Sequence, residues 1–377
     1  MAKSTKEIKT LAIITTDLNY NGGTIAIISA ARAMLRFGYE VTIISPYGDI
    51  NIINEVNAFG ISVIIYPSFL NMGKEEQNWI CKFDFLIVNV LQSIDCAIKT
   101  SLIIPMLWWI HEPSEKYCSI YASIICRYPL YFFNKKLQSI PVFTVSSVAR
   151  RTFNKYFPNV STQILPYCVQ DEAAVTDKKQ AYDNRSKKIT FALIAGFSEL
   201  KQQMLFLDAA EKINKLYAEK IQFLLIGKVG EDAYSRDVFS HAERIPNVEV
   251  KGVLTREQIA VAYKEEIDVV VCPSLEETMS LTITEGMMYG KICITSDNTG
   301  MAEYIKDGEN GFVCKTKDLD SLYEKMKYCI ENFENLEDVR KSARKTFEEN
   351  FTMEIFGKRL DGIIQDIMNN SNISKRS

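Results

Sequence analysis

The chain is 377 residues long, and its composition excludes several classes of protein before any motif is considered. At roughly 150 residues per domain, this length predicts two domains, each with its own core. Hydrophobic residues make up 47% and charged residues 24%, which is typical of a globular protein and excludes a largely disordered or fibrous chain. The formal net charge is −3, so the overall charge does not indicate nucleic acid as a partner.

Histidine and cysteine usage narrows the chemistry further. The two histidines, His111 and His241, are too few for a metal site built from histidine. The nine cysteines occur singly, mostly within apolar runs, so we expect them to be reduced and buried, as in a cytoplasmic protein. The apolar run at residues 11–16 is too short for a signal-peptide core. The longest apolar run, residues 102–110, is shorter than the ~20 residues of a spanning helix, so we expect no membrane span.

Short apolar runs alternate with helical patterns along almost the whole chain, which predicts stacked βαβ units with parallel sheets. The runs predicted to be strands are residues 11–15, 41–45, 63–66, 85–90, 103–110 and 142–145 in the first half, and 189–195, 221–226, 248–250, 269–272 and 292–295 in the second. The clearest helix covers residues 24–37 and ends before Gly38. Two such series indicate an α/β fold with two Rossmann-like domains.

The polar stretch at residues 171–188 has no apolar periodicity and separates the two series, so it is the predicted linker. We therefore expect an N-terminal domain at residues 1–170 and a C-terminal domain at residues 189–350. The sequence then predicts a last helix over residues 351–369. Residues 370–377 are polar enough to predict a disordered tail.

Gly22 and Gly23 lie directly after the first predicted strand, where a helix begins at Thr24. Glycine has no Cβ, so the backbone can turn tightly and approach a ligand there. The helix N-terminus would direct its N–H groups and positive dipole end toward the same place, which suits an anion such as a diphosphate. An ordinary turn between strand and helix explains the two glycines equally well.

Two glutamates eight residues apart lie in the block of residues 271–315. Glu277 is on a loop after a buried strand, and Glu285 is within a helix that begins near Leu281 and ends at Gly290. Each carboxylate oxygen can accept a hydrogen bond from one of two neighbouring hydroxyls, so carboxylates are well suited to sugars. This spacing would let the two side chains hold different parts of one ligand.

The same block has the pattern P-S-x-x-E-x7-E-G-M-x-x-G-K, followed by S-D-N-T-G-x-x-E-Y-I and D-G-x-N-G-F. It closely resembles the donor-site signature of retaining glycosyltransferases of family 4, which have the GT-B fold of two Rossmann-like domains facing across a cleft. The resemblance continues through Gly22-Gly23, WWIHEP around His111, ILPYCVQ before the linker, and the segments ALIAGFSELKQQ, FLLIGK and VEVKGVL. It therefore covers nearly the whole chain.

The resemblance implies transfer of a sugar from a nucleotide-diphosphate donor to a hydroxyl acceptor, with retention of the anomeric configuration. The implied catalytic residues are Glu277, which would hold the transferred sugar, His111, which would touch the reacting centre, and Lys201, which would neutralise the leaving diphosphate. Glu285 would bind the ribose hydroxyls. The implied donor-binding residues are Gly22, Gly23, Thr24, Gly196, Lys201, Lys228, Thr278, Met279, Ser280, Leu281 and Glu285.

The resemblance implies neither a metal nor another cofactor, since N–H groups and a lysine can stabilise the charge of the leaving phosphate. Asp318-Leu319-Asp320 matches the metal-binding DxD pattern of another glycosyltransferase fold, but a helix start explains these acidic residues better. The chain departs from the family at two places. Thr278-Met279-Ser280 replaces the frequent Gly-Phe-Gly, and Phe197 follows Gly196 where an arginine is usual, so donor choice and phosphate binding should differ.

The stretch of residues 116–155 contains seven basic and no acidic side chains, interleaved with aromatic residues. It suits an anionic membrane surface, and a solvated basic face over core aromatics is the alternative. We expect a cytoplasmic protein, peripheral on the inner face of the cell membrane, with a glycan, lipid-linked or protein-linked acceptor in bacterial cell-surface glycan or glycoconjugate synthesis.

Two other functions stay open. The first is a nucleotide-sugar epimerase of the same fold, and the second is a catalytically weak glycosyltransferase partner subunit that binds a glycan or protein. The family resemblance also implies that the last helix crosses back to the N-terminal domain.

Overall fold

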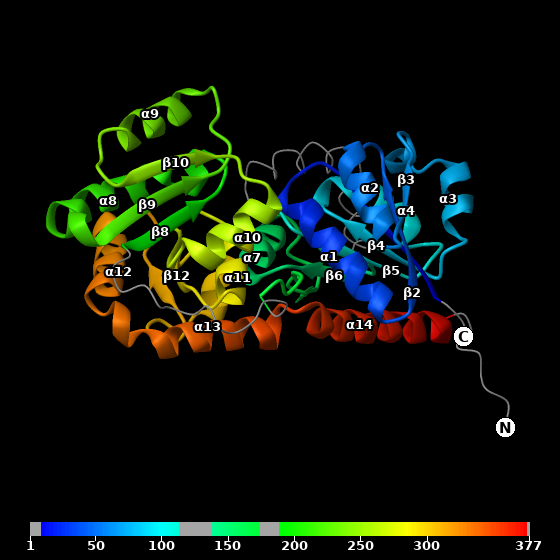
Figure 1. The fold of residues 1–377 in the computed structure, drawn as a ribbon. Helices are drawn as coiled ribbons and strands as arrows, with labels where there is room; N and C mark the ends of the chain where they lie inside the picture. The colour runs from blue at the N-terminus through cyan, green and yellow to red at the C-terminus, as the bar shows by residue number, and fades with distance from the viewer. Residues whose placement is uncertain (1–8, 113–137, 174–187, 375–377) are drawn as a thin grey trace. The chain divides into compact units, whose positions relative to one another are not determined.

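The computed structural model describes residues 9–112, 138–173 and 188–374. By its internal contacts the chain divides into two compact units, the first formed by residues 1–170 and 351–377 and the second by residues 171–350. Each unit contains one parallel sheet with helices packed against it (Figure 1). The α/β fold with two Rossmann-like sheets that the sequence predicts is therefore confirmed. Residues 174–187 of the predicted linker lie outside the described residues.

The first unit is built on a seven-stranded sheet with the order β3-β2-β1-β4-β5-β6-β7. Its strands are β1 (Lys9–Ile14), β2 (Tyr39–Ser45), β3 (Ser62–Ile65), β4 (Phe85–Asn89), β5 (Met106–Ile110), β6 (Val142–Thr144) and β7 (Thr162–Ile164). Its helices are α1 (Gly22–Arg36), α2 (Ile50–Ala58), α3 (Lys74–Ile80), α4 (Ile94–Thr100), α7 (Ser147–Tyr156) and α14 (Met353–Ser374), with 3₁₀ turns η1 (Phe69–Asn71) and η2 (Leu91–Ser93).

The local sequence explains most of these boundaries. Helix α1 begins where the Asn21 side chain accepts a hydrogen bond from the Thr24 N–H at 2.9 Å, and Gly38 follows its end with a φ of 85°. Strand β5 was predicted to begin at residue 103, but it begins at Met106. The N–H groups of Ile103 and Ile104 both donate to the Thr100 carbonyl and continue the turn after α4.

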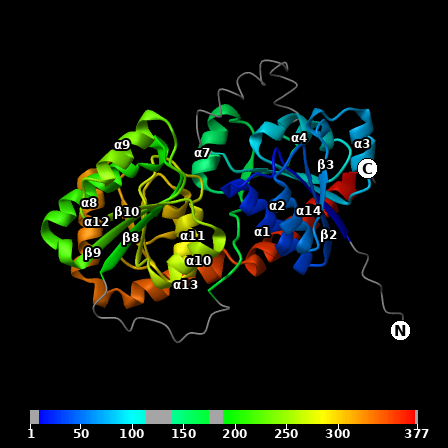
Figure 2. The ribbon, with the colours of Figure 1, turned by 45° about the horizontal axis from the view of Figure 1, so that its top comes forward.

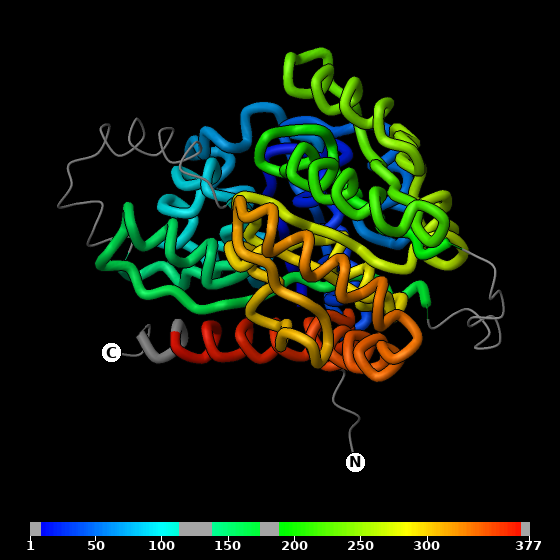
Figure 3. The backbone as a smooth tube through the Cα atoms, turned by 90° about the vertical axis from the view of Figure 1, so that its left-hand side faces the viewer, coloured from blue at the N-terminus to red at the C-terminus, as the bar shows by residue number. Residues whose placement is uncertain are grey.

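Helix α14, drawn in red in Figures 1 and 3, packs against α1 of the same unit. The Phe356 ring lies 5.5 Å from the Trp109 ring, and the Tyr39 hydroxyl donates to Asp361 at 2.6 Å. A Cβ at Gly357 would lie 2.4 Å from the Phe37 ring, so glycine permits this close approach. The prediction of a disordered tail from residue 370 is wrong for residues 370–374, since α14 continues to Ser374. Polar side chains do not end a helix whose backbone hydrogen bonds continue from a packed segment.

The second unit contains a six-stranded sheet with the order β10-β9-β8-β11-β12-β13. Its strands are β8 (Ile189–Ile194), β9 (Ile221–Ile226), β10 (Val248–Gly252), β11 (Val269–Cys272), β12 (Ile292–Ser296) and β13 (Phe312–Cys314). Its helices are α8 (Gln203–Tyr217), α9 (Ala233–Ala242), α10 (Arg256–Glu265), α11 (Leu281–Met288), α12 (Leu319–Glu331) and α13 (Glu337–Asn350), with 3₁₀ turns η3 (Glu199–Lys201), η4 (Ala218–Lys220), η5 (Gly300–Tyr304) and η6 (Phe333–Asn335).

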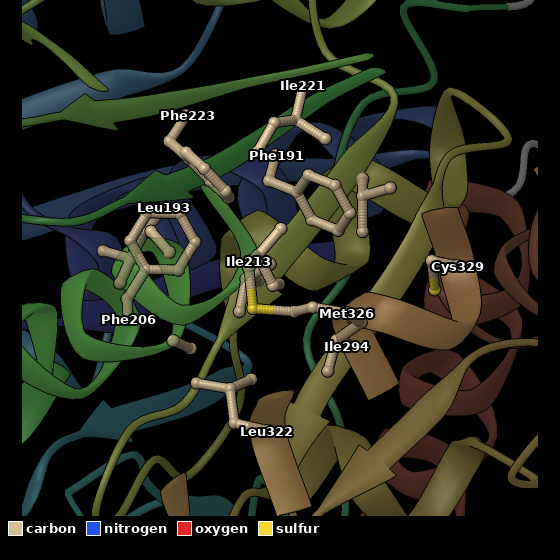
Figure 4. Packing of buried hydrophobic residues seen from close by; sticks show 14 of the residues in the cluster. Phe191, Leu193, Phe206, Ile213, Ile221, Phe223, Ile294, Leu322, Met326 and Cys329 are labelled. Carbon is tan, nitrogen blue, oxygen red and sulfur yellow. The ribbon is translucent and has the colours of Figure 1, made fainter. Parts of the chain in front are cut away.

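Helices cover both faces of this second sheet. Helix α8 contacts α9 and α12 on one face, and α11 contacts α13 on the other (Figure 2). Beneath α8, α9 and α12 lies an apolar core, in which Phe206 of α8 and Met326 of α12 pack with strand residues such as Phe191 and Phe223 (Figure 4). Strands covered on both faces become continuous apolar runs, which is why the sequence revealed most of them.

Strands β7 and β13, each three residues long, were missed from the sequence, whereas β6, which is equally short, was predicted. The cysteines in the described parts of the chain are free thiols, and all of them except Cys81 are buried. None of the helices that the structure describes is both long and apolar enough to cross a membrane.

Candidate active site

In the second unit, the loops that follow strands β8, β11 and β12 are hydrogen-bonded to one another. The Leu275 N–H donates to the Leu200 carbonyl at 2.8 Å, which joins the loops after β11 and β8. The Gly300 N–H donates to the Glu277 carbonyl at 2.9 Å, which joins the loops after β11 and β12. Glu277 is therefore held between two neighbouring loops at the carboxyl edge of a parallel sheet, where ligands bind in open α/β folds.

The structure brings Lys201 and Glu277 together, although they are 76 residues apart in the chain. The Lys201 ammonium forms an ion pair with Glu277 Oε2, which also accepts a hydrogen bond from the Ser274 hydroxyl at 3.3 Å. Burial lowers the pKa of Lys201, but the charge of Glu277 outweighs this effect and raises the pKa above its ordinary value. Lys201 is therefore a cation over the neutral pH range, beside the glutamate predicted to hold the sugar.

Glu285 lies within α11 and is only 3% exposed. Burial raises its pKa, and the Arg256 guanidinium opposes that rise by donating from Nη1 to Glu285 Oε1 at 2.6 Å. The sequence prediction missed Arg256. Its only local signal is a basic residue at the start of α10, and such residues are common on helix surfaces.

The loop that replaces Gly-Phe-Gly leads directly into α11. Ser280 is the N-cap, and its hydroxyl accepts the Ile283 N–H at 3.4 Å. Met279 is 4% exposed, so its side chain packs inward, and Thr278 lies next to Glu277 in this loop. The predicted residues Thr278 to Leu281 thus form the entry to a helix whose positive dipole end favours anions.

Gly196 and Lys228 follow β8 and β9, and their loops are joined by the Phe197 N–H, which donates to the Lys228 carbonyl at 2.9 Å. The Gln203 side chain also donates to the Gly196 carbonyl at 3.1 Å. The close approach of these loops requires Gly227, where a Cβ would lie 2.1 Å from the Ala195 carbonyl oxygen. The Lys228 side chain is exposed.

In the first unit, Gly22, Gly23 and Thr24 form the first turn of α1 after strand β1. Neither glycine has a positive φ, and a Cβ at Gly22 would have no neighbour within 4 Å. The tight turn that the sequence suggested therefore does not require glycine at position 22. Close approach of a ligand is the remaining physical reason for a glycine there.

His111 follows strand β5, with its ring 4.3 Å from the Trp109 ring, and burial lowers its pKa to about 3. It is thus neutral at pH 7 and would act as a hydrogen-bonding group rather than as a cation. The next residue, Glu112, was missed as a candidate. It accepts the N–H groups of Leu91 and His111, and burial raises its pKa to about 7.

Two further residues noted in the sequence, Asp318 and His241, have structural roles. Asp318 is the N-cap of α12 and accepts the Ser321 N–H at 2.9 Å, which confirms the helix-start interpretation. The ring nitrogens of His241 lie 3.7 Å from Asp208 and 3.6 Å from Glu211. Within the described residues, no three His, Cys, Asp or Glu side chains form a group that could hold a metal ion. Independence from metal stays a prediction.

Known proteins resemble this chain in sequence and in fold. Residues 175–346 match the family described as "Glycosyl transferases group 1". A trehalose synthase of Thermococcus litoralis is 21% identical over 322 residues, which cover 80% of this chain and 73% of that protein. The putative glycosyltransferase EpsD of Bacillus subtilis is 32% identical over 141 residues, covering 34% of this chain and 35% of that one.

Solved structures share the fold over almost the whole chain. A glycosyltransferase from Rickettsia africae has a TM-score of 0.78 at 18% identity and covers 97% of this chain and 100% of its own. Anabaena HepE in complex with UDP-glucose has a TM-score of 0.76 at 15% identity and covers 95% of this chain and 99% of its own.

The two parallel Rossmann-like sheets have the GT-B fold of these solved glycosyltransferase structures, and paired acidic and basic side chains lie at the carboxyl edge of the second sheet. The resemblance read from the motif at residues 271–315 is confirmed. The match to the group 1 glycosyltransferase family covers residues 175–346, which include this motif.

Proposed function

We propose that this glycosyltransferase moves a hexosyl group from a nucleoside-diphosphate sugar to a hydroxyl acceptor with retention of the anomeric configuration. The observation that carries the proposal is the pair of ionic contacts at one edge of the second sheet, Lys201 with Glu277 and Arg256 with Glu285. One carboxylate would accept hydroxyls of the sugar, and the other would accept hydroxyls of the ribose.

The leaving group would be stabilised by charges that are already in position. Negative charge develops on the distal phosphate as the glycosidic bond breaks, and a preorganised cation or N–H group lowers the free energy of that state. Lys201 and the N-terminus of α11 supply groups of this kind in the second unit. Gly22 and Gly23, at the start of α1, would add backbone N–H groups from the first unit.

The bond changes balance without a side-chain nucleophile. The bond between the anomeric carbon and the phosphate oxygen breaks, and the acceptor oxygen bonds to the same face of the sugar. The acceptor proton passes to the departing phosphate. His111, neutral at pH 7, would hydrogen-bond the donor sugar near the reacting centre.

Two features support the choice of donor and acceptor. HepE, which shares the fold, was crystallised with UDP-glucose, so we propose a UDP-hexose as the first donor to test. For the acceptor we propose a cell-surface glycan or glycoconjugate, with the enzyme acting at the cytoplasmic face of the membrane. The basic stretch at residues 116–155 supports this proposal, and in its described part Arg151 and Lys155 are exposed on α7. Residues 113–137 lie outside the described residues.

The test begins with a thermal-shift and ligand-observed NMR screen of UDP, GDP and dTDP and their sugars. We expect one nucleotide series to bind, with the sugar nucleotide stabilising the protein and Glu285→Ala abolishing the shift. Binding by none of the series would contradict the proposed donor class.

Product analysis separates the remaining functions. An epimer formed from the donor alone would indicate an epimerase, and sugar transferred only when an acceptor is present would indicate a transferase. A partner subunit would keep its biological activity in the Glu285→Ala variant. In a separate experiment, absence of flotation with anionic liposomes would contradict membrane contact.

A further inference from the structure

Arg256 contacts the buried glutamate that is proposed to bind the ribose, although no motif points to it. The Arg256 side chain is 28% exposed, whereas that of Glu285 is 3% exposed, and Arg256 Nη1 donates to Glu285 Oε1 at 2.6 Å. An unpaired buried carboxylate is strongly disfavoured and tends to take up a proton. A protonated Glu285 would lose acceptor capacity for hydroxyl groups, so the partner determines whether this residue can bind a sugar or ribose.

The guanidinium is held from a second side. Arg256 Nη2 lies 3.6 Å from Glu172 Oε1, and the other oxygen of Glu172 accepts the Tyr289 hydroxyl at 3.2 Å. The Tyr289 ring in turn stacks on Tyr263, with centroids 5.1 Å apart and planes inclined by 15°. A planar guanidinium between two carboxylates has little freedom to rotate, so it presents a fixed direction to Glu285.

The segment that carries Glu172 is itself fixed to α11. Asp171 accepts two hydrogen bonds from Arg344, at 2.9 and 2.5 Å, and Arg344 also donates to the Met288 carbonyl at 2.6 Å. The Glu172 N–H donates to the Met288 sulfur at 3.4 Å. Because Met288 and Glu285 belong to the same helix, these contacts fix the position of Glu172 relative to Glu285.

We propose that Arg256 is a positioning residue for the donor, which holds the Glu285 carboxylate ionised and oriented so that its remaining acceptor sites meet ligand hydroxyls. A carboxylate has about four acceptor sites, so one hydrogen bond from Arg256 leaves capacity for a diol. The inference rests on the proposed function, because it assigns to Arg256 a role in the same donor site. Glu172 supports this role indirectly, because it contacts Arg256 and restricts its orientation.

The experiment is a double-mutant cycle read by isothermal titration with UDP, or with GDP or dTDP if the nucleotide screen selects one of those. The variants are Arg256→Gln, Glu285→Gln and the double variant, with the exposed Arg244→Gln as a matched control. We expect Arg256→Gln to weaken binding roughly 10- to 100-fold, the range for a charged hydrogen bond. In the Glu285→Gln background the same substitution should add less than about threefold, because the residue through which it acts is gone.

The cycle distinguishes positioning from a merely structural role. An equal loss of affinity in both backgrounds, or no loss in the wild-type background, would overturn the inference. If Glu285→Gln itself leaves affinity unchanged, the proposed role of Glu285 is wrong and the inference falls with it. If Glu285→Gln weakens binding and Arg256→Gln does not, only the role of Arg256 is wrong.

A second variant covers the case in which Arg256→Gln does not fold. Arg256→Lys keeps a cation but loses the planar fork that contacts both glutamates. We expect a folded protein with binding weakened roughly tenfold, whereas Glu172→Gln, which keeps the Arg256–Glu285 contact, should weaken it less than about threefold. Wild-type affinity in Arg256→Lys would overturn the proposal.

The pH profile supplies an independent readout. The charged and titratable groups that face Glu285 include Arg256 and Tyr263 from α10, Tyr289 at the end of α11, and Glu172 from the segment before the second sheet. Burial already raises the pKa of Glu285, and loss of the arginine should raise it further. Donor binding needs the ionised form, so the acid limb of kcat/KM should move to higher pH in the Arg256→Gln variant, which loses the cation. An unmoved limb would contradict the proposal.

Discussion

The two units have closely similar sheet topologies but differ in the charges of the candidate site residues at the edges of their sheets. In both sheets the strand order reverses beside the first strand, between β1 and β4 in one unit and between β8 and β11 in the other. The second unit presents two ion pairs at or near this edge, Lys201–Glu277 and Arg256–Glu285.

The first unit presents groups whose charged forms are disfavoured by burial. Burial keeps His111 neutral, and it raises the pKa of Glu112 to about 7. The comparison teaches that one fold can support ion pairs at one edge and buried groups of reduced charge at the equivalent edge, because side chains on the loops, rather than the sheet, set the electrostatics.

The largest expected effect comes from breaking the charged site. Lys201→Ala should lower kcat roughly 100- to 1,000-fold, because it removes a preorganised cation from the leaving phosphate. Lys201→Arg should recover part of the loss. Steady-state kinetics with the sugar nucleotide measures the effect, and Lys215→Ala, an exposed substitution on α8, is the control. Activity of Lys201→Ala within a few-fold of wild type would show that the cation is not used.

The stability of the first unit should respond to pH through its buried residue His111. The pKa of His111 lies near 3 in the folded protein and near 6.5 when unfolded, so the unfolded state takes up the proton first and stability falls as the pH drops below 6.5. Replacing His111 by Gln removes this loss. When the pH is lowered from 7.5 to 5, the free energy of unfolding of the wild type should therefore fall by about 2 kcal/mol more than that of the variant.

Chemical denaturation of both proteins at several pH values measures that difference. Comparing variant with wild type also separates His111 from Glu112, whose raised pKa acts in the opposite direction by reducing stability as the pH rises from about 4.5 to 7. A variant that parallels the wild type at every pH would show that His111 is protonated more easily than its burial indicates.

Two glycines extend the comparison with smaller effects. A Cβ at Gly286 of α11 would lie 2.9 Å from both Cys293 and Val270, so Gly286→Ala should destabilise the second unit by about 1–3 kcal/mol. A Cβ at Gly22 of α1 meets nothing within 4 Å, so Gly22→Ala should leave the melting temperature unchanged or slightly raised.

If Gly22 serves a ligand, the same Gly22→Ala variant should bind the sugar nucleotide more weakly despite its intact fold. Thermal unfolding and titration of one preparation give both values. A Gly22→Ala protein with wild-type affinity would show that this glycine belongs to the turn alone.

Much of the fold could be predicted from the sequence because its signals are local. Strands buried on both faces are continuous apolar runs, as in β9 and β11, and caps such as Asn21 lie beside the helices that they begin. Short strands were predicted less well: β7 and β13 were missed and the equally short β6 was found, since a run of three residues is weak evidence for a strand. The length of α14 was also underestimated, because its polar end continues the hydrogen bonds of a packed helix.

By itself, the sequence determined the fold class and, through the motif that contains Glu277 and Glu285, the resemblance to a glycosyltransferase family. Only the tertiary structure decided the partners of these carboxylates, because Lys201 is 76 residues from Glu277 and Arg256 is 29 residues from Glu285 along the chain. It also decided the protonation of His111 and Glu112, which depends on burial by distant segments. Residue types and spacing are carried by the chain, whereas electrostatic environment arises from contacts that folding creates.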